Sequence, residues 1–405
     1  MEEFKTYKLE ELTIGKGEYG IGASAVPFDS SKYMYLRITD INDDGTLNKQ
    51  NLMSVDDINA CNYILKKNDI VFARTGNSTG RSYFYDGSDG VLVYAGFLIK
   101  FSIDDNKVNP RILKYYTHSK PYFDWVHSFD TGGTRGNINA KTYGTMPIIL
   151  PSRKIQDKIV SILKSFDDKI ELNRRINENL EQQAQALFKS WFVDFEPFKD
   201  GKFVDSELGL IPKGWKVGFY TELVDIKGGG TPKTEIKEYW NGNIPFFSPK
   251  DIGSSCFILD TEKYITANGL ENCNSNLFPP YTVFITARGT VGKVVMSGCE
   301  MAMNQTNYAL LGKHNISQYY VYLITLQLAT RLLKKANGAV FNAITTRDFT
   351  SEQIIIPFDS VIKDFSSIVR PIYENILLNE FQIKTLSQLR DTILFRLMSG
   401  ELKIK

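Results

Sequence analysis

The sequence has 405 residues, of which 42% are hydrophobic and 23% charged, as in an ordinary globular protein of several domains. The net charge of +2 is far from the strongly basic signature of many nucleic-acid-binding domains, so charge neither demands nor excludes DNA as a partner. No apolar stretch approaches the roughly 20 residues that cross a bilayer, and the charged N-terminus does not resemble a signal peptide. We therefore expect a cytoplasmic protein with reduced cysteines and no membrane partner.

Residues 1–150 have the pattern of a first globular block, with short strands punctuated by glycine, asparagine and aspartate. Asp69–Ala73 and Val91–Tyr94 are clear strand patterns, and a helical pattern covers 110–127. Gly15–Gly20 matches G-x-G-x-x-G, but no strand precedes the motif and no helix follows it at once. We predict a flexible loop there rather than a nucleotide site.

The chain then changes character twice. Residues 151–200 have helical periodicity, and 201–214 have the glycine, proline and charge content of a linker. A second block with strand patterns covers 215–357, including a strand at Thr282–Thr286. Residues 358–405 are predicted to be largely helical again.

The sequence also repeats itself, because 112–193 and 318–399 match at an offset of about 206. The best segment pairs Ile149–Pro151 with Ile355–Pro357, and a long helical pattern follows each. Self-similarity on this scale indicates that one folding unit was duplicated. We predict an α+β fold in which two α/β domains are separated by two long antiparallel helices, a coiled-coil spacer, with a pseudo-two-fold internal repeat.

Apolar residues of the two helical segments recur at alternating steps of three and four, as a coiled-coil seam requires. Both series contain two successive steps of four, within Ile162–Ile170 and within Ile368–Ile376. Asn173 and Asn379 occupy equivalent seam positions, where two amides that meet would fix the register; the alternative is that both are solvated. Pro371 predicts that the second helix bends or begins near that residue.

No catalytic centre is evident. The three histidines and four cysteines have no metal-ligand spacing, so we predict no metal site. Asp194–Phe198 loosely resembles the Asn/Asp-Pro-Pro-Tyr/Phe motif of amino-methylating DNA methyltransferases, but it lacks the two consecutive prolines. The chain also lacks a glycine-rich loop for S-adenosylmethionine, so we assign no catalytic residue and no cofactor to it.

Two pairs of corresponding segments suit polar surface contacts. Segments 74–81 and 288–293 each have a basic residue at both ends with hydroxyls and glycines between; the alternative is a strand-linking turn that needs glycine. Segments 131–141 and 337–347 each lie between a helix and an Ile-Ile/Leu-Pro strand, and their divergence fits either two different readers or loop drift. Such side chains reach base edges and phosphates. The candidate DNA-contacting residues are Arg74, Thr75, Asn77, Ser78, Thr79, Arg81, Arg135, Asn137, Lys141, Lys250, Arg288, Thr290, Lys293, Asn342 and Arg347.

The stretch Ile170–Phe195 (IELNRRINENLEQQAQALFKSWFVDF) closely resembles the central conserved region of the specificity (S) subunit of type I restriction–modification systems. Ile211–Trp215 (IPKGW) resembles the start of that family's second target-recognition domain. The resemblance covers the whole chain. It implies target-recognition domain 1 over 1–150, a central conserved helical region over 151–200, a linker over 201–214, target-recognition domain 2 over 215–357 and a distal conserved helical region over 358–405.

The resemblance also implies a division of labour. Each target-recognition domain would read one half of a bipartite, asymmetric site in double-stranded DNA, and the helices would set the gap between the halves. The S subunit of this family is not catalytic: two modification (M) subunits dock on the conserved helices and bring S-adenosylmethionine and adenine methylation, and restriction (R) subunits add translocation and cleavage with ATP and Mg²⁺. The docking candidates here are Leu180, Leu187, Trp191 and Phe192.

Three other functions stay open at this point. The specificity subunit of a related two-part type II restriction system would have the same sequence features. A self-contained DNA methyltransferase or nuclease is disfavoured by the missing cofactor loop and catalytic motif. A coiled-coil scaffold with two protein-binding heads would use the same architecture without DNA.

Overall fold

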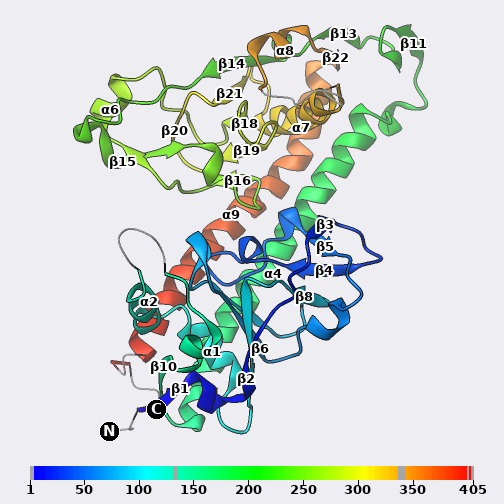
Figure 1. The fold of residues 1–405 in the computed structure, drawn as a ribbon. Helices are drawn as coiled ribbons and strands as arrows, with labels where there is room; N and C mark the ends of the chain where they lie inside the picture. Colours follow the sequence, from blue (N-terminus) through cyan, green and yellow to red (C-terminus); the bar gives the residue numbers. More distant parts are fainter. Residues whose placement is uncertain (1–3, 131–135, 336–342, 399–400, 403–405) are drawn as a thin grey trace. The chain divides into compact units, whose positions relative to one another are not determined.

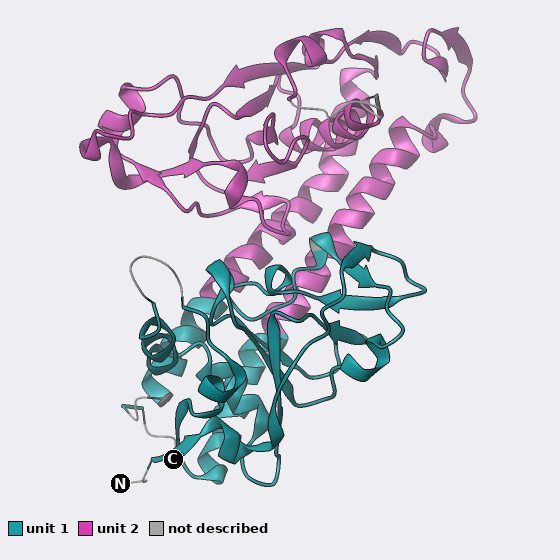
Figure 2. Cartoon of the chain, in the orientation of Figure 1, with its two compact units in different colours: residues 1–168, 386–405 teal, residues 169–385 magenta. Residues whose placement is uncertain are grey.

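The computed structural model (Figure 1) describes residues 4–130, 136–335, 343–398 and 401–402. The chain divides into two compact units (Figure 2). We call residues 1–168 with 386–405 the N-terminal unit, and residues 169–385 the second unit. The N-terminal unit therefore contains both ends of the chain.

The N-terminal unit combines two four-stranded sheets with helices. One sheet has the order β2-β9-β6-β7 and is antiparallel throughout, and the other has the order β3-β5-β4-β8. A separate antiparallel pair joins β1 to β10. The strands are β1 (Lys5–Lys8), β2 (Thr13–Tyr19), β3 (Ala25–Pro27), β4 (Tyr33–Leu36), β5 (Met53–Val55), β6 (Asp69–Ala73), β7 (Ser82–Tyr85), β8 (Leu92–Tyr94), β9 (Leu98–Ile103) and β10 (Pro147–Leu150). The helices are α1 (Pro110–Tyr116), α2 (Lys120–His127), α3 (Ala140–Gly144) and the first part of α4 (Arg153–Phe192).

The main core of this unit lies between the β2-β9-β6-β7 sheet and the helices. Every residue of β6 is buried, because the strand lies inside the sheet and both of its faces are covered. Phe72 of β6 stacks on Tyr143 of α3 with ring centroids 4.8 Å apart. Leu394 and Leu397, from the end of the chain, belong to the same buried cluster. The chain's last helix is thus an integral part of its first unit.

The second unit has a five-stranded sheet with the order β14-β21-β18-β19-β16, a three-stranded sheet with the order β17-β15-β20, and two antiparallel pairs. Its strands are β11 (Phe203–Ser206), β12 (Gly209–Pro212), β13 (Lys216–Phe219), β14 (Val224–Gly228), β15 (Trp240–Phe247), β16 (Phe257–Ile258), β17 (Tyr264–Ile265), β18 (Val283–Thr286), β19 (Val294–Ser297), β20 (Ala302–Met303), β21 (Asn307–Gly312) and β22 (Gln353–Ile356). Its helices are α5 (Tyr220–Leu223), α6 (Ala267–Glu271), α7 (Gln318–Lys335), α8 (Thr346–Ser351) and most of α9 (Asp359–Met398).

The two units share local connections. Antiparallel pairs with four registered residues join β1 to β10 and β13 to β22, and α4 and α9 follow β10 and β22. The order β2-β9-β6-β7 also corresponds to β14-β21-β18-β19, again antiparallel at each step. These correspondences agree with the repeat found in the sequence and give an element-by-element alignment of the units.

Three local expectations differ from the structure. The segment 201–214, predicted as a linker, contains the antiparallel hairpin β11–β12, and Ile211 is buried in the core of the second unit. Gly15–Gly20, predicted as a loop, is mostly part of β2, where the register shifts between Ile14 and Glu18. Pairing with β9 forms this strand, although its glycines are typical of a loop. Pro371 does not start a helix, because α9 begins at Asp359 and continues past it.

The long helices α4 and α9 run antiparallel. In the second unit Phe188 of α4 contacts Phe365 of α9, with ring centroids 5.9 Å apart, and Asn177 of α4 contacts Asn379 further along α9. The predicted seam is right in most positions but not at the double step of four. Ile162 and Ile368 are 37% and 42% exposed, and the next residues, Leu163 and Val369, are fully buried in their place. The same shift occurs at equivalent positions of both helices.

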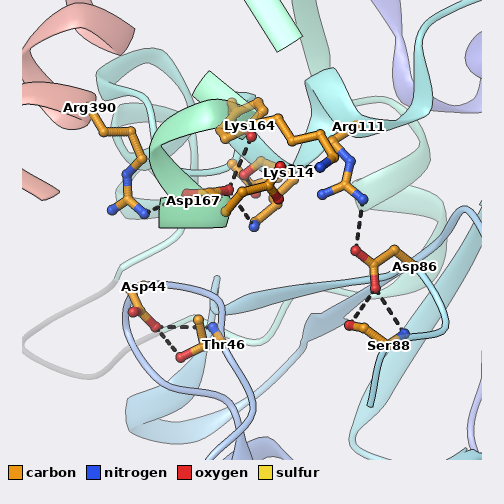
Figure 3. Close-up of polar contacts among 12 residues, drawn as sticks. Asp44, Thr46, Asp86, Ser88, Arg111, Lys114, Lys164, Asp167 and Arg390 are labelled. Carbon is orange, nitrogen blue, oxygen red and sulfur yellow. Dashed lines mark hydrogen bonds and ion pairs between the residues drawn. The ribbon is translucent and has the colours of Figure 1, made fainter. Parts of the chain in front are cut away.

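A charge cluster joins α4 to α9 within the N-terminal unit (Figure 3). Asp167 of α4 accepts hydrogen bonds from Lys114 at 2.7 Å, from the hydroxyl of Tyr115 at 3.0 Å and from Arg390 of α9 at 3.0 Å. Burial opposes ionisation of Asp167, but the two cations outweigh it and lower the pKa of this carboxyl. Arg390, a charged residue of α9 that is itself half-buried, thus has a half-buried acidic partner.

Within the residues that the structure describes, no helix is both long enough and apolar enough to cross a membrane.

Replacing Leu394 with alanine is expected to destabilise the protein by about 3 kcal/mol, because the side chain is 4% exposed and fills the N-terminal core. Leu389, on the same helix, is 46% exposed, and its replacement with alanine provides the matched control. Chemical denaturation of the full chain measures both. Equal losses for the two variants would contradict the packing of the last helix described above.

Replacing Asp167 with asparagine is expected to cost about 2 kcal/mol at neutral pH, because Lys114 and Arg390 lose their shared anion. The pKa of Asp167 is lowered in the folded state, so its contribution is present above the unfolded pKa and is lost as the pH falls through the folded pKa. The gap between wild type and variant should therefore close below about pH 4. Asp168→Asn is the control, because Asp168 pairs with Lys164 on the exposed face of the same helix. A gap that stays constant down to pH 3 would be inconsistent with this assignment.

Candidate nucleic-acid interface

The loop that follows β6, residues 74–81, is held by its own backbone. The amide of Ala73 donates to the carbonyl of Arg81 at 2.8 Å, and the amide of Gly80 donates back to Ala73 at 3.0 Å. Gly80 has φ +87° and lies so close to Val126 that a Cβ would come within 2.6 Å of it. Its counterpart Gly292 has φ +83° in the corresponding loop after β18. The glycines of both loops are thus explained by turn geometry.

Three predicted contact residues of this loop are used inside the protein. Ser78 and Thr79 are 9% and 5% exposed, and the Thr79 hydroxyl donates to the carbonyl of Gly76 at 2.8 Å. The guanidinium of Arg81 donates to the carbonyl of Ile41 at 3.1 Å and forms an ion pair with Asp43 at 2.7 Å. These contacts hold the loop 41–43 and leave the three side chains poorly placed for an external ligand. The sequence motif does not predict that Ser78 and Thr79 are buried or that Arg81 is paired within the protein.

Arg74 and Asn137 come together although 63 positions separate them. The Arg74 Nε donates to the Asn137 Oδ1 at 3.4 Å, and the amide of Ile138 donates to the carbonyl of Arg74 at 3.0 Å. The guanidinium also lies over the ring of Tyr19, 5.0 Å from its centroid. The sequence analysis missed Tyr19, which ends β2. An exposed aromatic residue that closes a strand was the available signal.

The other candidates of the N-terminal unit lie close by in sequence. Lys141 is exposed in the first turn of α3, whose N-cap Asn139 accepts from the amide of Thr142 at 2.9 Å. Asn77 is exposed and Thr75 is half-buried. Arg135 lies outside the described residues.

In the second unit the corresponding loop after β18 presents Arg288, Thr290 and Lys293, all exposed. The Thr286 hydroxyl donates to the carbonyl of Thr290, and the amide of Lys293 donates to the same hydroxyl at 3.0 Å, so the backbone of the loop is fixed from below. Among the described residues we find no hydrogen bond or ion pair on the side chains of Arg288 or Lys293. Both cations therefore face solvent, in contrast to Arg81.

Two further candidates are exposed on short helices of this unit. Arg347 lies in α8, whose N-terminus is capped by Thr345: its amide and hydroxyl both donate to Asp348 at 2.7 Å. The amide of Ile344 donates to the carbonyl of Ala287 at 2.9 Å, which ties this segment to the loop after β18. Lys250 is exposed in the 3₁₀ turn Pro249–Asp251, and among the described residues no hydrogen bond or ion pair joins it to the other candidates. Asn342 lies outside the described residues.

Polar side chains interrupt the seam between α4 and α9, but not in the expected pairs. Asn379 donates to Asn177 at 2.8 Å, Asn177 donates to Glu380 at 2.8 Å, and Asn173 donates to Gln382 at 3.1 Å. Asn173 and Asn379 therefore do not pair with each other, because the helices are offset by about one turn from the expected alignment. Asn173 is only 1% exposed, so it lies in the seam rather than in water.

A second polar contact fixes α4 against α7 in the second unit. The Tyr322 hydroxyl donates to the Glu181 Oε1 at 2.8 Å. Burial raises the pKa of Glu181, and the hydrogen bond from Tyr322 only partly opposes that effect. The contact specifies how this face of α4 is oriented.

The candidate docking residues of α4 contribute to the core of the second unit. Phe192 is 8% exposed and contacts Phe365 with ring centroids 4.9 Å apart, so little of its ring is accessible to a partner. Leu180, Leu187 and Trp191 are half-buried against the same cluster. The accessible feature beside them is a groove of about 460 Å³ between α4 and α7. It is lined by Gln185, Ala186, Phe188, Lys189, Val193, Leu323, Leu326, Gln327 and Thr330.

Among the described residues, no group of three or more histidine, cysteine, aspartate or glutamate side chains is arranged to hold a metal ion. The arrangement as a whole offers exposed cations and amides on loops with a fixed backbone, which is the chemistry of contacts to nucleic-acid phosphates and base edges.

Comparisons with known proteins agree with this chemistry. Residues 1–182 and 212–388 match the family described as type I restriction modification DNA specificity domain. The type I restriction enzyme HindI specificity subunit of Haemophilus influenzae is 27% identical over 402 residues, covering 84% of this chain and 87% of that protein. The type I restriction enzyme MjaIX specificity subunit of Methanocaldococcus jannaschii is 29% identical over 300 residues, covering 72% of this chain and 69% of that protein. The type I restriction–modification system S subunit from M. genitalium has a similar fold, with a TM-score of 0.53, 14% identity, and 98% of this chain and 96% of that chain covered.

Replacing Asn173 with leucine is expected to stabilise the chain by about 1 kcal/mol, because its buried Oδ1 has no hydrogen-bond donor among the described residues and Gln382 is exposed enough to be hydrated. Asn177→Leu should destabilise by about 1 to 2 kcal/mol, since Asn379 and Glu380 lose their partner. Thermal unfolding of the two variants under identical conditions makes the comparison. Stabilisation by Asn177→Leu would contradict the seam network.

Proposed function

The chain belongs to the family of type I restriction–modification DNA specificity domains, and from this premise we propose that it reads a bipartite, asymmetric DNA site, one half with each unit. The observation that carries the proposal is the pair of corresponding loops after β6 and β18, each with a fixed backbone that bears basic side chains: the half-buried Arg74 in the first, and the exposed Arg288 and Lys293 in the second. Matched backbones with different side chains suit two readers of different sequences. The long helices α4 and α9, of 40 residues each, would be the coiled-coil spacer that fixes the gap between half-sites.

The proposal includes a division into domains and partners. Target-recognition domains would occupy 1–150 and 215–357, with the helical regions 151–200 and 358–405 conserved for assembly. We propose that the chain is not catalytic and that two M subunits bind the helical regions and supply S-adenosylmethionine chemistry on adenine. R subunits would add ATP- and Mg²⁺-dependent translocation and cleavage. The half-buried Leu187 and Trp191 and the groove between α4 and α7 support α4 as a surface for M.

The experiment is methylome sequencing of a host that lacks adenine methylation and expresses M with or without this chain. Expression with the chain should give methylation at one bipartite motif, and omission of the chain should abolish it. Methylation of the same motif without this chain would overturn the proposal. Failure of the complex to retard DNA would instead favour the scaffold.

A double variant, Arg288→Ala with Lys293→Ala, tests the second unit. In complex with M it should bind the methylated motif about 10- to 100-fold more weakly, because two exposed cations that could meet phosphates or bases are lost. If both contact phosphate, the slope of log affinity against log salt should also fall by about two. Lys216→Ala is the control, because Lys216, on β13, is paired with Glu222 of α5. Equal losses in the double variant and in the control would argue against the loop after β18 as an interface.

A further inference from the structure

The cluster at the end of β6 combines residues from three separate segments. Tyr19 is the last residue of β2, Arg74 directly follows β6, and Asn137 lies just before α3. The amide of Ala140 donates to the Tyr19 hydroxyl at 3.1 Å, which fixes the ring over which the Arg74 guanidinium lies. Asn137 accepts from the Nε of the same guanidinium. Ring and amide together define the plane and direction of the arginine.

Backbone hydrogen bonds identify the counterparts of these residues in the second unit. The amide of Arg74 donates to Phe97 and its carbonyl accepts from Ile138; the amide of Ala287 donates to Thr306 and its carbonyl accepts from Ile344. Arg74 therefore corresponds to Ala287.

The strand registers give the counterpart of the ring in the same way. In the N-terminal unit, Tyr19 pairs with Ile99 of β9, and Ile99 pairs with Phe72 of β6. In the second unit, Gly228 pairs with Tyr308 of β21, and Tyr308 pairs with Ile285 of β18. Tyr19 therefore corresponds to Gly228.

This correspondence separates a structural role from a functional one. The second unit closes the same hydrogen bonds with a glycine and an alanine at the two positions, so the backbone frame does not require the ring or the cation. A folding role shared by both units therefore does not explain why these two positions are tyrosine and arginine in the N-terminal unit. The cluster is a property of one unit alone, as a residue that reads one half-site would be.

The remaining atoms of Arg74 have the geometry of a base-reading group. Among the described residues, its two terminal nitrogens have no hydrogen bond and no ion pair, whereas Arg81 is paired with Asp43 and Lys100 with Glu18. A planar guanidinium held on an aromatic face retains two parallel donors at its outer edge. Those donors match the O6 and N7 acceptors of guanine in the major groove.

We propose that Arg74 reads a guanine in one half-site and that Tyr19 and Asn137 are positioning residues that fix its guanidinium. The inference rests on the proposed function and adds to it a base, a unit and a reader. Tyr19 acts through Arg74: its ring sets the plane of the guanidinium, and its hydroxyl joins the ring to the start of α3.

The test uses the complete chain in complex with M and the bipartite motif found by methylome sequencing. Arg74→Ala should reduce discrimination at a single G·C position of one half-site by roughly 10- to 100-fold, with the other half-site read as before. Arg74→Lys should lose the same discrimination, because it keeps the charge but not the fork. Tyr19→Phe, which keeps the ring but not the hydroxyl that accepts from Ala140, should lose only part of the discrimination. Tyr19→Leu, which loses the ring, should lose the discrimination at the same base pair and no other.

Each alternative gives a different result. Uniform weakening on all sequences by Arg74→Ala, with a salt slope reduced by about one, would mean a phosphate contact and would overturn guanine reading. Unchanged recognition in Arg74→Ala and Arg74→Lys would overturn the inference while the proposed function stands. A wild-type complex that neither binds nor methylates DNA would contradict the proposed function itself. Identical discrimination in Tyr19→Leu and Tyr19→Phe would remove the positioning role. Arg288→Ala is the directional control, expected to act on the opposite half-site.

Discussion

The structure depends on the return of the last helix to the first unit. Leu394 and Leu397 complete a core whose other members come from residues before 168, and Arg390 supplies one of the cations around Asp167. The apolar contacts remove side-chain surface from water, and the hydrogen bonds from Lys114 and Arg390 satisfy the half-buried carboxylate of Asp167. Both long helices pass from one unit into the other (Figure 2), so the N-terminal unit is made of two segments of the chain, and the second unit is the single segment 169–385 between them.

Much of the architecture was readable from sequence because it follows from periodicity. The strand pattern of Asp69–Ala73 and the helical patterns that became α4 and α9 depend on local side-chain spacing, and the structure confirms them. The hairpin in 201–214 was missed because its strands are short and rich in turn-forming residues, so its pairing, rather than its composition, makes it a strand pair. Pro371 does not mark the start of the second helix, because α9 continues through it and Phe365 and Tyr373, on either side of it, are buried in the core of the second unit.

The candidate interface was only partly predictable, for a different reason. The sequence motif identified Arg74, Asn137 and Arg81 as equal candidates for DNA contact. It could not show that Arg81 is used internally, because the ion pair between Arg81 and Asp43 depends on the tertiary fold. Burial of Ser78 and Thr79 is likewise a tertiary property. The duplication adds information that a single motif does not contain. Because the same strand order and backbone hydrogen bonds occur in both units, each residue can be compared with its counterpart in the other unit. Side chains that the backbone structure requires can then be distinguished from side chains that differ between the units.

The placement of the chain's two ends in one unit has a consequence for biosynthesis. Residues 169–385 are synthesised before Leu394 and Leu397, so the N-terminal unit still lacks part of its core when the second unit is complete. The core of the N-terminal unit therefore cannot be completed before residues 169–385 have been synthesised. Premature termination shortly before Arg390 would leave a well-formed second unit attached to an unfinished first one, with the apolar faces of α4 around Ile159 and Leu163 open to chaperones and proteases.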